Sequence, residues 1–315
     1  MDSDSVNLDL LDQYMAISNK LKKRFLKRPN LAEACESFIE LAKHCESLDL
    51  PVYAGLCWRA AASCEDSSSN NIGETSCLVQ SARQLLKAEE TDARVNCKSV
   101  YGEYLQAGLS CCAYAASKNK FGDGCSMQIC LDLEIIDFLR RINKVEYVES
   151  YLEDAVELCK DRCDSRIYCL ELFASLFIKS GDFLAALETY YEITKIIENS
   201  TLNGARCEIL LKCEVNSVLL LLILRPNPQK LPARLAKILE KYTWGDVNDV
   251  SLQICKMTEN VFNLLNSLVM TCQSLDTSSL VELETELWSI LSKEQKELLR
   301  ILLKTYELVP GVDEN

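Results

Sequence analysis

The stretch "SLFIKSGDFLAALETYY" (residues 175–191) decides the fold, because it holds two apolar runs separated by Gly181 and Asp182. Such a pair between apolar runs is typical of a tight turn between two helices. Ala174 and Ala186 are small, which allows two antiparallel helices to approach closely. Phe177 and Tyr190 are predicted to fill the space beside them, and Leu170, Phe173 and Phe183 fall on the matching positions of the pattern. The stretch therefore predicts a helix–turn–helix unit.

The spacing of these residues is that of a tetratricopeptide-type helix hairpin, the repeating unit of a class of α-solenoids. The rest of the chain also favours helix, because it contains only 10 Gly and 6 Pro in 315 residues. No stretch alternates convincingly between apolar and polar residues, so we expect essentially no sheet. The predicted fold class is all-α, a tetratricopeptide-like α-solenoid of antiparallel helix hairpins.

We predict that residues 1–315 form a single α-solenoid. Its N-terminal helical repeats span 1–198, the short joint "NSTLNGA" spans 199–205, and C-terminal helices span 206–308 before a tail at 309–315.

Several motifs predict where the helices begin and end. Asn30 with Glu33, Ser279 with Glu282, and Ser292 with Gln295 have capping-box spacing. Polar or proline-containing stretches predict breaks between helices, namely "CEDSSSNNIGETS" (64–76), "NSTLNGA" (199–205) and "RPNPQKLP" (225–232). The apolar run Val218–Leu224 predicts a fully buried helix segment.

The net charge of −13 makes general binding to nucleic acid unfavourable, because an acidic body repels phosphate backbones. The apolar run "VLLLLIL" is far shorter than the roughly 20 residues that span a bilayer, so we expect no direct membrane insertion. The acidic start "MDSDSVNLDLLDQ" lacks the apolar segment of a secretory signal. We therefore expect a soluble intracellular protein.

The 17 cysteines raise the question of a metal or redox site. The sequence has no C-x-x-C pair and a single histidine, and most cysteines fall on apolar helical positions. Buried structural thiols are the preferred interpretation, and a cysteine-based zinc or redox protein remains an alternative. We predict no metal and no cofactor.

No arrangement of residues indicates catalysis. Neither Gly-rich phosphate-binding motif occurs, and "FGDGCS" (121–126) is a turn between predicted helices. His44 precedes Cys45, but neighbours on a helix point about 100° apart and cannot form a dyad by themselves. We therefore predict that the chain is not an enzyme.

The stretch "SNKLKKRFLKRPN" (18–30) concentrates positive charge in an acidic chain. An apolar stripe through Leu21 and Phe25 predicts one amphipathic helix that stops at Pro29. Three interpretations stay open: a solvated flank near a helix C-terminus, a docking face for an acidic partner, and a nuclear-import or lipid-binding segment. The candidate partner-binding residues are Lys20, Lys22, Lys23, Arg24, Lys27 and Arg28.

Several stretches resemble one known family. "YMAISNKLKKRFLKRPNLAEA" (14–34), "LKCEVNSVLLLLILRPNPQKLP" (211–232), "LEKYTW" (239–244) and "ELWSILSKEQKELL" (286–299) are similar, in this order, to the forty-kilodalton huntingtin-associated protein family. The resemblance covers both ends well and the middle loosely. Relatives can carry a long proline-rich insert before the Leu-rich helix, where this chain has only "NSTLNGA".

The resemblance implies a tetratricopeptide-like partner of huntingtin, seated between the HEAT-repeat domains of that scaffold and stabilising it. It also implies a link to the GTPase Rab5 and to the motility of early endosomes. The implied location is the cytoplasm, with early endosomes and a nuclear pool as further locations to test. No catalytic residue or cofactor comes with the family.

The C-terminal signature contains further candidate docking residues. Glu282 and Glu286 are four apart on one helix face and could form an acidic docking patch with Glu294; a solvated face is the competing interpretation. The signature also includes Tyr242 and Trp244, without indicating which side chain is buried. A membrane-trafficking adaptor that acts independently of huntingtin is the alternative function.

Overall fold

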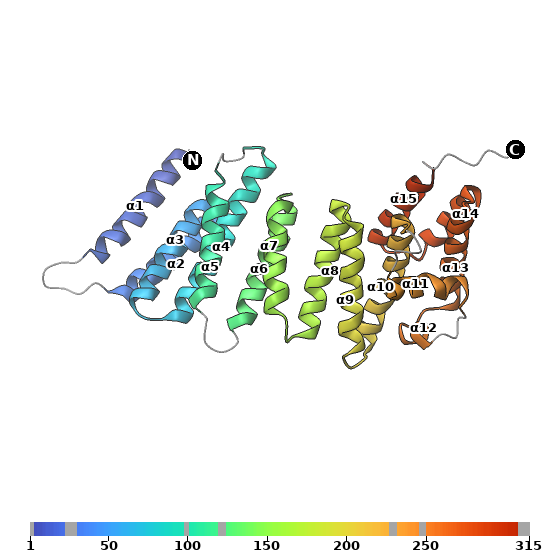
Figure 1. Cartoon of the computed structure of the whole chain (residues 1–315). Helices are drawn as coiled ribbons and strands as arrows, with labels where there is room; N and C mark the ends of the chain where they lie inside the picture. Colours follow the sequence, from blue (N-terminus) through green and yellow to red (C-terminus); the bar gives the residue numbers. More distant parts are fainter. Residues whose placement is uncertain are drawn as a thin grey trace. The chain divides into compact units, whose positions relative to one another are not determined.

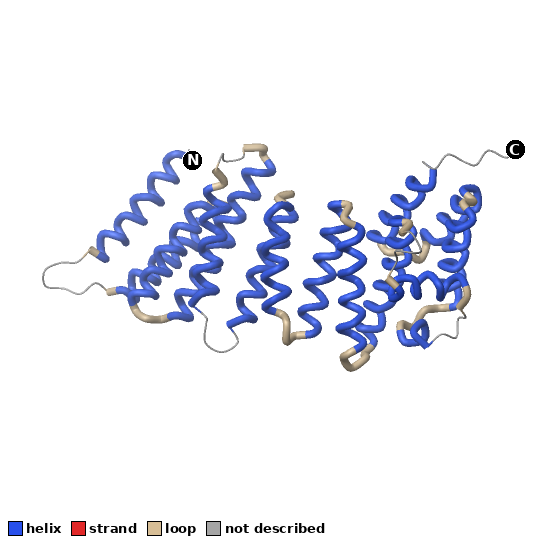
Figure 2. The backbone as a smooth tube through the Cα atoms, viewed as in Figure 1, coloured by secondary structure: helices blue, strands red, loops and turns tan. Residues whose placement is uncertain are grey.

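The computed structural model describes residues 3–22, 30–97, 101–118, 124–226, 232–245 and 250–307 (Figure 1). All regular elements in these ranges are helices, which confirms the all-α prediction (Figure 2). The helices group into two compact units, Met1–Leu158 and Cys159–Asn315, each of which is described by itself. The expected joint at 199–205 lies inside the second unit. The single-solenoid organisation stays a prediction.

The first unit consists of helices that pack in sequence order, each against the next (Figure 1). They are α1 (Ser3–Leu21), α2 (Leu31–Ser47), α3 (Pro51–Ser67), α4 (Asn71–Arg94), α5 (Glu103–Lys118), α6 (Gly124–Arg141), the 3₁₀ turn η1 (Val145–Tyr147) and α7 (Val148–Leu158).

Two glycines set the close packing of α3, α4 and α5. A Cβ at Gly55 would lie 2.9 Å from Cγ of Leu85, and a Cβ at Gly108 would lie 2.9 Å from Cδ2 of Leu86. The buried Ser81 hydroxyl of α4 donates to the Gly55 carbonyl of α3 at 2.8 Å. A larger residue at either glycine would push α4 away from its neighbour, because packed interiors leave little free volume.

The second unit is organised around one central helix. Its elements are α8 (Cys163–Ser180), α9 (Phe183–Glu198), α10 (Gly204–Leu224), α11 (Ala233–Thr243), α12 (Val250–Ile254), α13 (Glu259–Ser274), α14 (Thr277–Trp288) and α15 (Lys293–Glu307). Helix α10 packs against α9, α11, α13 and α15. Its segment Val218–Ile223 is at most 9% exposed, which confirms the predicted buried run. In the described ranges, no helix has both the length and the apolar character needed to span a membrane.

The predicted helix–turn–helix at 175–191 is confirmed. Helices α8 and α9 pack against each other across a turn at Gly181 and Asp182. Gly181 has φ +82°, a left-handed conformation that glycine adopts most readily. Oδ1 of Asp182 then caps α9 by accepting from the backbone N–H of Ala185 at 3.0 Å.

The small residues and Tyr190 are buried as predicted, whereas Phe177 is only half-buried. Ala174 of α8 and Ala186 of α9 are completely buried, as is the Tyr190 ring. Phe173 and Phe177 stack on each other with their ring centroids 4.5 Å apart.

The predicted polar loop at 64–76 is wrong, because only Ser68–Asn70 separate α3 from α4. The serine-rich end of α3 is helical, and the hydroxyls of Ser67 and Ser68 are satisfied within it, because they donate to carbonyls four residues earlier at 2.8 and 2.9 Å. Asn70 starts α4 by accepting the backbone N–H of Gly73 at 3.2 Å.

The N-cap at Asn30 and the capping box at Ser292 are confirmed, but the capping box at Ser279 is wrong. The Glu33 carboxylate accepts from the side-chain amide of Asn30 at 3.2 Å, whereas a full capping box uses the backbone N–H. Ser292 and Gln295 exchange backbone-to-side-chain hydrogen bonds of 2.9 and 3.4 Å. Helix α14 begins earlier than predicted, because the Asp276 carboxylate accepts from the backbone N–H groups of Ser278 and Ser279. Hydrogen bonds from the two serines lower the pKa of Asp276 to about 2, so the cap is charged at neutral pH.

Replacing Gly181 with alanine should destabilise the second unit by about 1 kcal/mol, because an L-residue is strained at this positive φ. A Cβ at Gly181 would meet no atom within 4 Å, so backbone strain alone is tested. Gly204→Ala is the matched control, since a Cβ there is also unobstructed. Thermal unfolding measures both variants, and equal melting temperatures would contradict the expected strain.

Candidate partner-binding surfaces

The structure describes only the beginning of the predicted basic block. The prediction of one helix that continues to Pro29 is wrong, because α1 ends at Leu21 and the backbone N–H of Lys22 donates to the Asn19 carbonyl three residues back, at 3.3 Å. Lys20 and Lys22 are exposed. Nζ of Lys20 lies 3.8 Å from Oε1 of Glu33, and both side chains are about 60% exposed. An exposed ion pair of this kind contributes about 0–1 kcal/mol and leaves Lys20 accessible to a partner. Four predicted residues lie outside the described ranges: Lys23, Arg24, Lys27 and Arg28.

The apolar face of α1 that precedes the block packs against the next helices. Leu10 is 3% exposed, and the ring of Tyr14 lies 5.2 Å from that of Phe38 in α2. Tyr14 and Leu21 also line a cavity of about 490 Å³ that α1 shares with α2 and α3. This face of α1 therefore contacts the first unit.

The three predicted acidic residues do not form one patch. Glu282 and Glu286 are exposed on α14. Glu294 belongs to α15, where Oε2 accepts from the Tyr190 hydroxyl at 3.4 Å and lies 3.8 Å from Nζ of Lys212. Lys212 also donates to Glu171 at 2.9 Å. Glu294 thus ties α15 to α9 and α10, and an acidic patch in this region is limited to Glu282 and Glu286.

The signature stretch "LEKYTW" (239–244) contains one core residue and one surface residue. Tyr242 is completely buried, its ring lies 5.5 Å from that of Phe262, and its hydroxyl donates to Glu214 at 3.3 Å. Trp244, two residues later, is 88% exposed. Tryptophan is the residue type that most often dominates a protein interface, so an exposed one is a strong candidate contact.

Trp244 lies at a groove of about 430 Å³ formed by α10, α11, α13 and α15. Its lining includes the apolar side chains of Leu221, Leu222 and Leu239. The guanidinium of Arg225 lies 3.5 Å above the ring centroid of Tyr306 and donates to the Thr305 carbonyl at 3.2 Å. An apolar groove with a fixed cation and an exposed indole is suited to an amphipathic segment of another protein.

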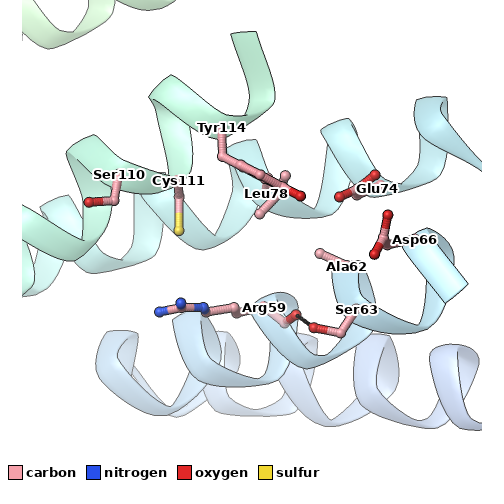
Figure 3. Close-up of a pocket in the computed structure, with 9 residues that line it drawn as sticks. All are labelled: Arg59, Ala62, Ser63, Asp66, Glu74, Leu78, Ser110, Cys111 and Tyr114. Carbon is pink, nitrogen blue, oxygen red and sulfur yellow. Dashed lines mark hydrogen bonds between the residues drawn. The ribbon is translucent and has the colours of Figure 1, made fainter. Parts of the chain in front are cut away.

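A second pocket, of about 320 Å³, lies between α3, α4 and α5 in the first unit (Figure 3). Asp66 and Glu74 lie side by side at one end of it and Arg59 at the other. Nζ of Lys118 bridges the two carboxylates, at 2.9 Å from Asp66 and 3.0 Å from Glu74. Because Glu74 is 2% exposed, this bridge neutralises a buried charge and joins α5 to α3 and α4.

The two serine hydroxyl groups of this pocket are bonded to backbone carbonyls of their own helices. Ser63 donates to the Arg59 carbonyl at 3.1 Å (Figure 3). Ser110 donates to the Gln106 carbonyl at 2.7 Å. His44 is exposed on α2 whereas the adjacent Cys45 is 1% exposed, so the two side chains point apart, as helical spacing predicts.

Thirteen of the 17 cysteines are buried, which makes them part of the packed core. Burial raises the pKa of Cys57 and of Cys112 to about 12, so these thiols are protonated and poorly nucleophilic at neutral pH. Within the described ranges, no group of three or more His, Cys, Asp or Glu side chains is placed to hold a metal ion.

Comparison with known proteins supplies the family. No protein-family model matches the sequence. The chain is, however, 30% identical to the 40-kDa huntingtin-associated protein of mouse over 355 aligned residues, covering 94% of this chain and 92% of the mouse protein. The rat protein matches with the same identity and coverage.

The chain belongs to the 40-kDa huntingtin-associated protein family.

The family match confirms the resemblance found in the signature stretches. Its 355 positions exceed the 315 residues of this chain, so the mouse relative has at least 40 residues in the matched region that this chain lacks. This difference agrees with the expected absence of a long insert.

Sequence reasoning for this huntingtin-associated family member missed the groove beside Trp244. Its lining comes from four helices that are distant along the chain, and no local pattern indicates that they meet. The one signal in the sequence was Trp244 itself, which follows the last turn of the amphipathic helix α11.

One buried carboxyl group in the first unit should make stability depend on pH. Asp132 of α6 is 7% exposed, and its Oδ2 has no hydrogen-bond partner. Burial, and secondarily the charge of Asp154, raise the pKa of Asp132 to about 6. An unfolded aspartate has a pKa of about 3.9, so the folded state binds more protons between these values. This contribution lowers stability as the pH rises from about 4 to about 6.

Replacing Asp132 with asparagine should therefore stabilise the first unit at pH 7 by about 2 kcal/mol, because no buried charge forms. The gain should shrink towards zero near pH 4, where the wild-type carboxyl is already protonated. Melting temperatures of both proteins across this pH range test the prediction. A gain that is the same at pH 4 and pH 7 would assign the effect to packing.

Proposed function

We propose that this chain is a non-catalytic interaction protein whose partner is the huntingtin of its own organism. The observation that carries the proposal is the 30% identity, over 94% of this chain, to mouse and rat proteins named for their association with huntingtin. The exposed Trp244 and its groove support a role in protein binding, because they combine a large aromatic side chain with an apolar recess.

The proposal includes the finer features that the family resemblance implies. The helix pairs stack as a tetratricopeptide-like α-solenoid, seated between the HEAT-repeat domains of huntingtin and stabilising it. The complex acts with Rab5 in the motility of early endosomes. An interface of this kind should bury far more than the roughly 1,600 Å² of a standard complex.

Within this interface, we place Trp244 and the adjoining groove in contact with huntingtin. Trp244→Ala should weaken the complex by about 2 kcal/mol, which corresponds to a roughly 30-fold higher Kd. Stability of the free protein should change little, since the side chain is 88% exposed. Tyr101→Ala is the matched control, because Tyr101 is an aromatic residue of the first unit that is 80% exposed.

Co-expression with the organism's huntingtin, followed by size-exclusion chromatography, tests the complex itself, and titration of the purified partners compares the variants. Separate elution of the two wild-type proteins at low and moderate salt would contradict the proposed function. Co-elution with equal affinities for the Trp244 and Tyr101 variants would contradict the assignment of the groove alone.

The basic block at 18–30 is proposed as a second contact. Reversing Lys20, Lys23 and Lys27 to glutamate should weaken huntingtin binding at low salt and less so at high salt, because exposed charges are screened. Helix content, measured by circular dichroism, should be unchanged. If the charge-reversed variant and wild type bind huntingtin equally at low salt, the block is a solvated helix flank and not a contact.

A further inference from the structure

The exposed side of α15 carries a row of basic residues at helical spacing. Steps of three, four and four residues separate Lys293, Lys296, Arg300 and Lys304, which places all four within one narrow face of the helix. Two acidic residues share this face by the same spacing, Glu297 and Glu307. We call these four residues the α15 basic stripe. It extends over about 17 Å, at 1.5 Å per residue.

The opposite side of α15 is fixed in the core of the second unit. Leu298, Leu299 and Leu302 are completely buried, and Tyr306 is 5% exposed. The side chains of Lys293, Arg300 and Lys304 are exposed as a consequence. The stripe therefore faces outward from the unit.

The stripe has an excess of positive charge, because four basic residues share the face with two acidic ones. None of its four residues has an ion-pair partner among the described residues. Some basic residues of the second unit are paired: Arg206 lies 2.7 Å from Asp164, Lys212 lies 2.9 Å from Glu171, and Arg234 lies 2.6 Å from Glu188. Lys179 and Lys237 are exposed and, like the stripe, have no ion pair among the described residues. The stripe differs from these single cations because its four members share one helix face.

Local helix energetics explain only one member of the stripe. Lys304 lies in the last turn of α15, where a cation is favoured by the helix dipole. Lys293 is the first residue of the helix, where a cation is disfavoured. Lys296, Arg300 and Lys304 repeat at intervals of four, and such like-charge neighbours weakly destabilise a helix. An anionic partner would offset both the unfavourable position of the Lys293 charge and the repulsion between the like charges.

An aromatic surface borders the stripe. Nζ of Lys296 lies 5.2 Å and the guanidinium of Arg300 lies 4.7 Å from the ring of Trp288 on α14. These cation–π contacts hold the two cations in place. Val281, seven residues before Trp288 and so on the same side of α14, is 56% exposed. The surface thus combines a basic row with an apolar edge.

We propose that the α15 basic stripe, with Trp288 and Val281 beside it, receives an acidic amphipathic helix of the partner protein. Carboxylates spaced three or four residues apart on that helix would match the spacing of the cations, and its apolar side chains would cover Val281 and the exposed part of Trp288. The inference rests on the proposed function in taking this helix to belong to huntingtin. It adds a contact of defined chemistry to that complex.

A protein segment fits the stripe better than a membrane or a nucleic acid does. Glu282 and Glu286 are exposed on the neighbouring helix α14, and a broad polyanionic surface would meet them as well as the stripe. A single helix is about 10 Å wide, so it meets fewer of the α14 carboxylates than a broad surface does, although Glu284 lies on the same side of α14 as Val281 and Trp288. The negative net charge of the chain also repels an extended polyanion.

Charge reversal of the three exposed members tests the inference in the full chain. The variant Lys293→Glu, Arg300→Glu, Lys304→Glu should bind huntingtin about tenfold more weakly than wild type at about 50 mM salt, and the difference should narrow at about 300 mM. The control, Lys43→Glu, Lys179→Glu, Lys237→Glu, changes three exposed lysines by the same total charge. Its affinity should stay within about threefold of wild type.

A second measurement uses a fluorescent peptide probe. The probe is a helical peptide of about 18 residues with glutamates along one face and leucines along the other, and its glutamine counterpart is the control. Wild type and the Lys43 set should bind the glutamate peptide, and the α15 variant should not. Circular dichroism establishes that each variant is folded. If the variant with glutamate at 293, 300 and 304 unfolds, a variant with glutamine at the same three positions is used instead.

The outcomes separate this inference from the proposed function. If wild type binds huntingtin but the two charge-reversed variants are weakened equally, the stripe inference is overturned and the proposed function stands. If wild type does not bind huntingtin, the proposed function fails, and binding of the glutamate peptide then tests the stripe inference. Loss of peptide binding in the α15 variant alone supports the stripe inference. Absence of peptide binding by wild type overturns the stripe inference. Stripe-dependent binding to vesicles of about 30% phosphatidylserine, without peptide binding, would also overturn it.

Discussion

Burial of the apolar segment Val218–Ile223 is the constraint on which the second unit depends. A helix that is apolar on all sides must be covered on all sides, and α9, α11, α13 and α15 provide this cover. Each covering helix consequently has one face set by contact with α10 and another left for solvent or a partner. The groove beside Trp244 and the α15 basic stripe are both on helices that are positioned in this way.

The polar contacts of the second unit add orientation to this apolar packing. Glu294 reaches Tyr190 and Lys212, and Glu214 reaches Tyr242, so both carboxylates join helices that α10 already holds together. Burying such groups is favourable only when they are well paired, and their pairing fixes how α11 and α15 are rotated about their axes. That rotation directs the surface residues outward.

Helix existence could be predicted well from the sequence, because it depends on local spacing. The turn at Gly181, the cap at Asn30 and the buried run in α10 are all local features, and all are confirmed. The errors have local features in common: serines near residue 67 are accommodated in the helix with their hydroxyls bonded to helix carbonyls, and Asp276, not Ser279, caps α14. The surfaces could not be predicted, because Glu294 and Trp244 are placed by helices distant along the chain.

The buried cysteines have a consequence for how the protein resists oxidation. While the core is closed, burial keeps the pKa of thiols such as Cys77 and Cys272 near 11, and oxidants meet almost no thiolate there. Opening of a unit would expose many thiols at once and return each towards an ordinary pKa of about 8.5. Protection of the buried thiols from oxidation therefore depends on the units staying folded. A partner that stabilises the folded state also slows the oxidation of these thiols.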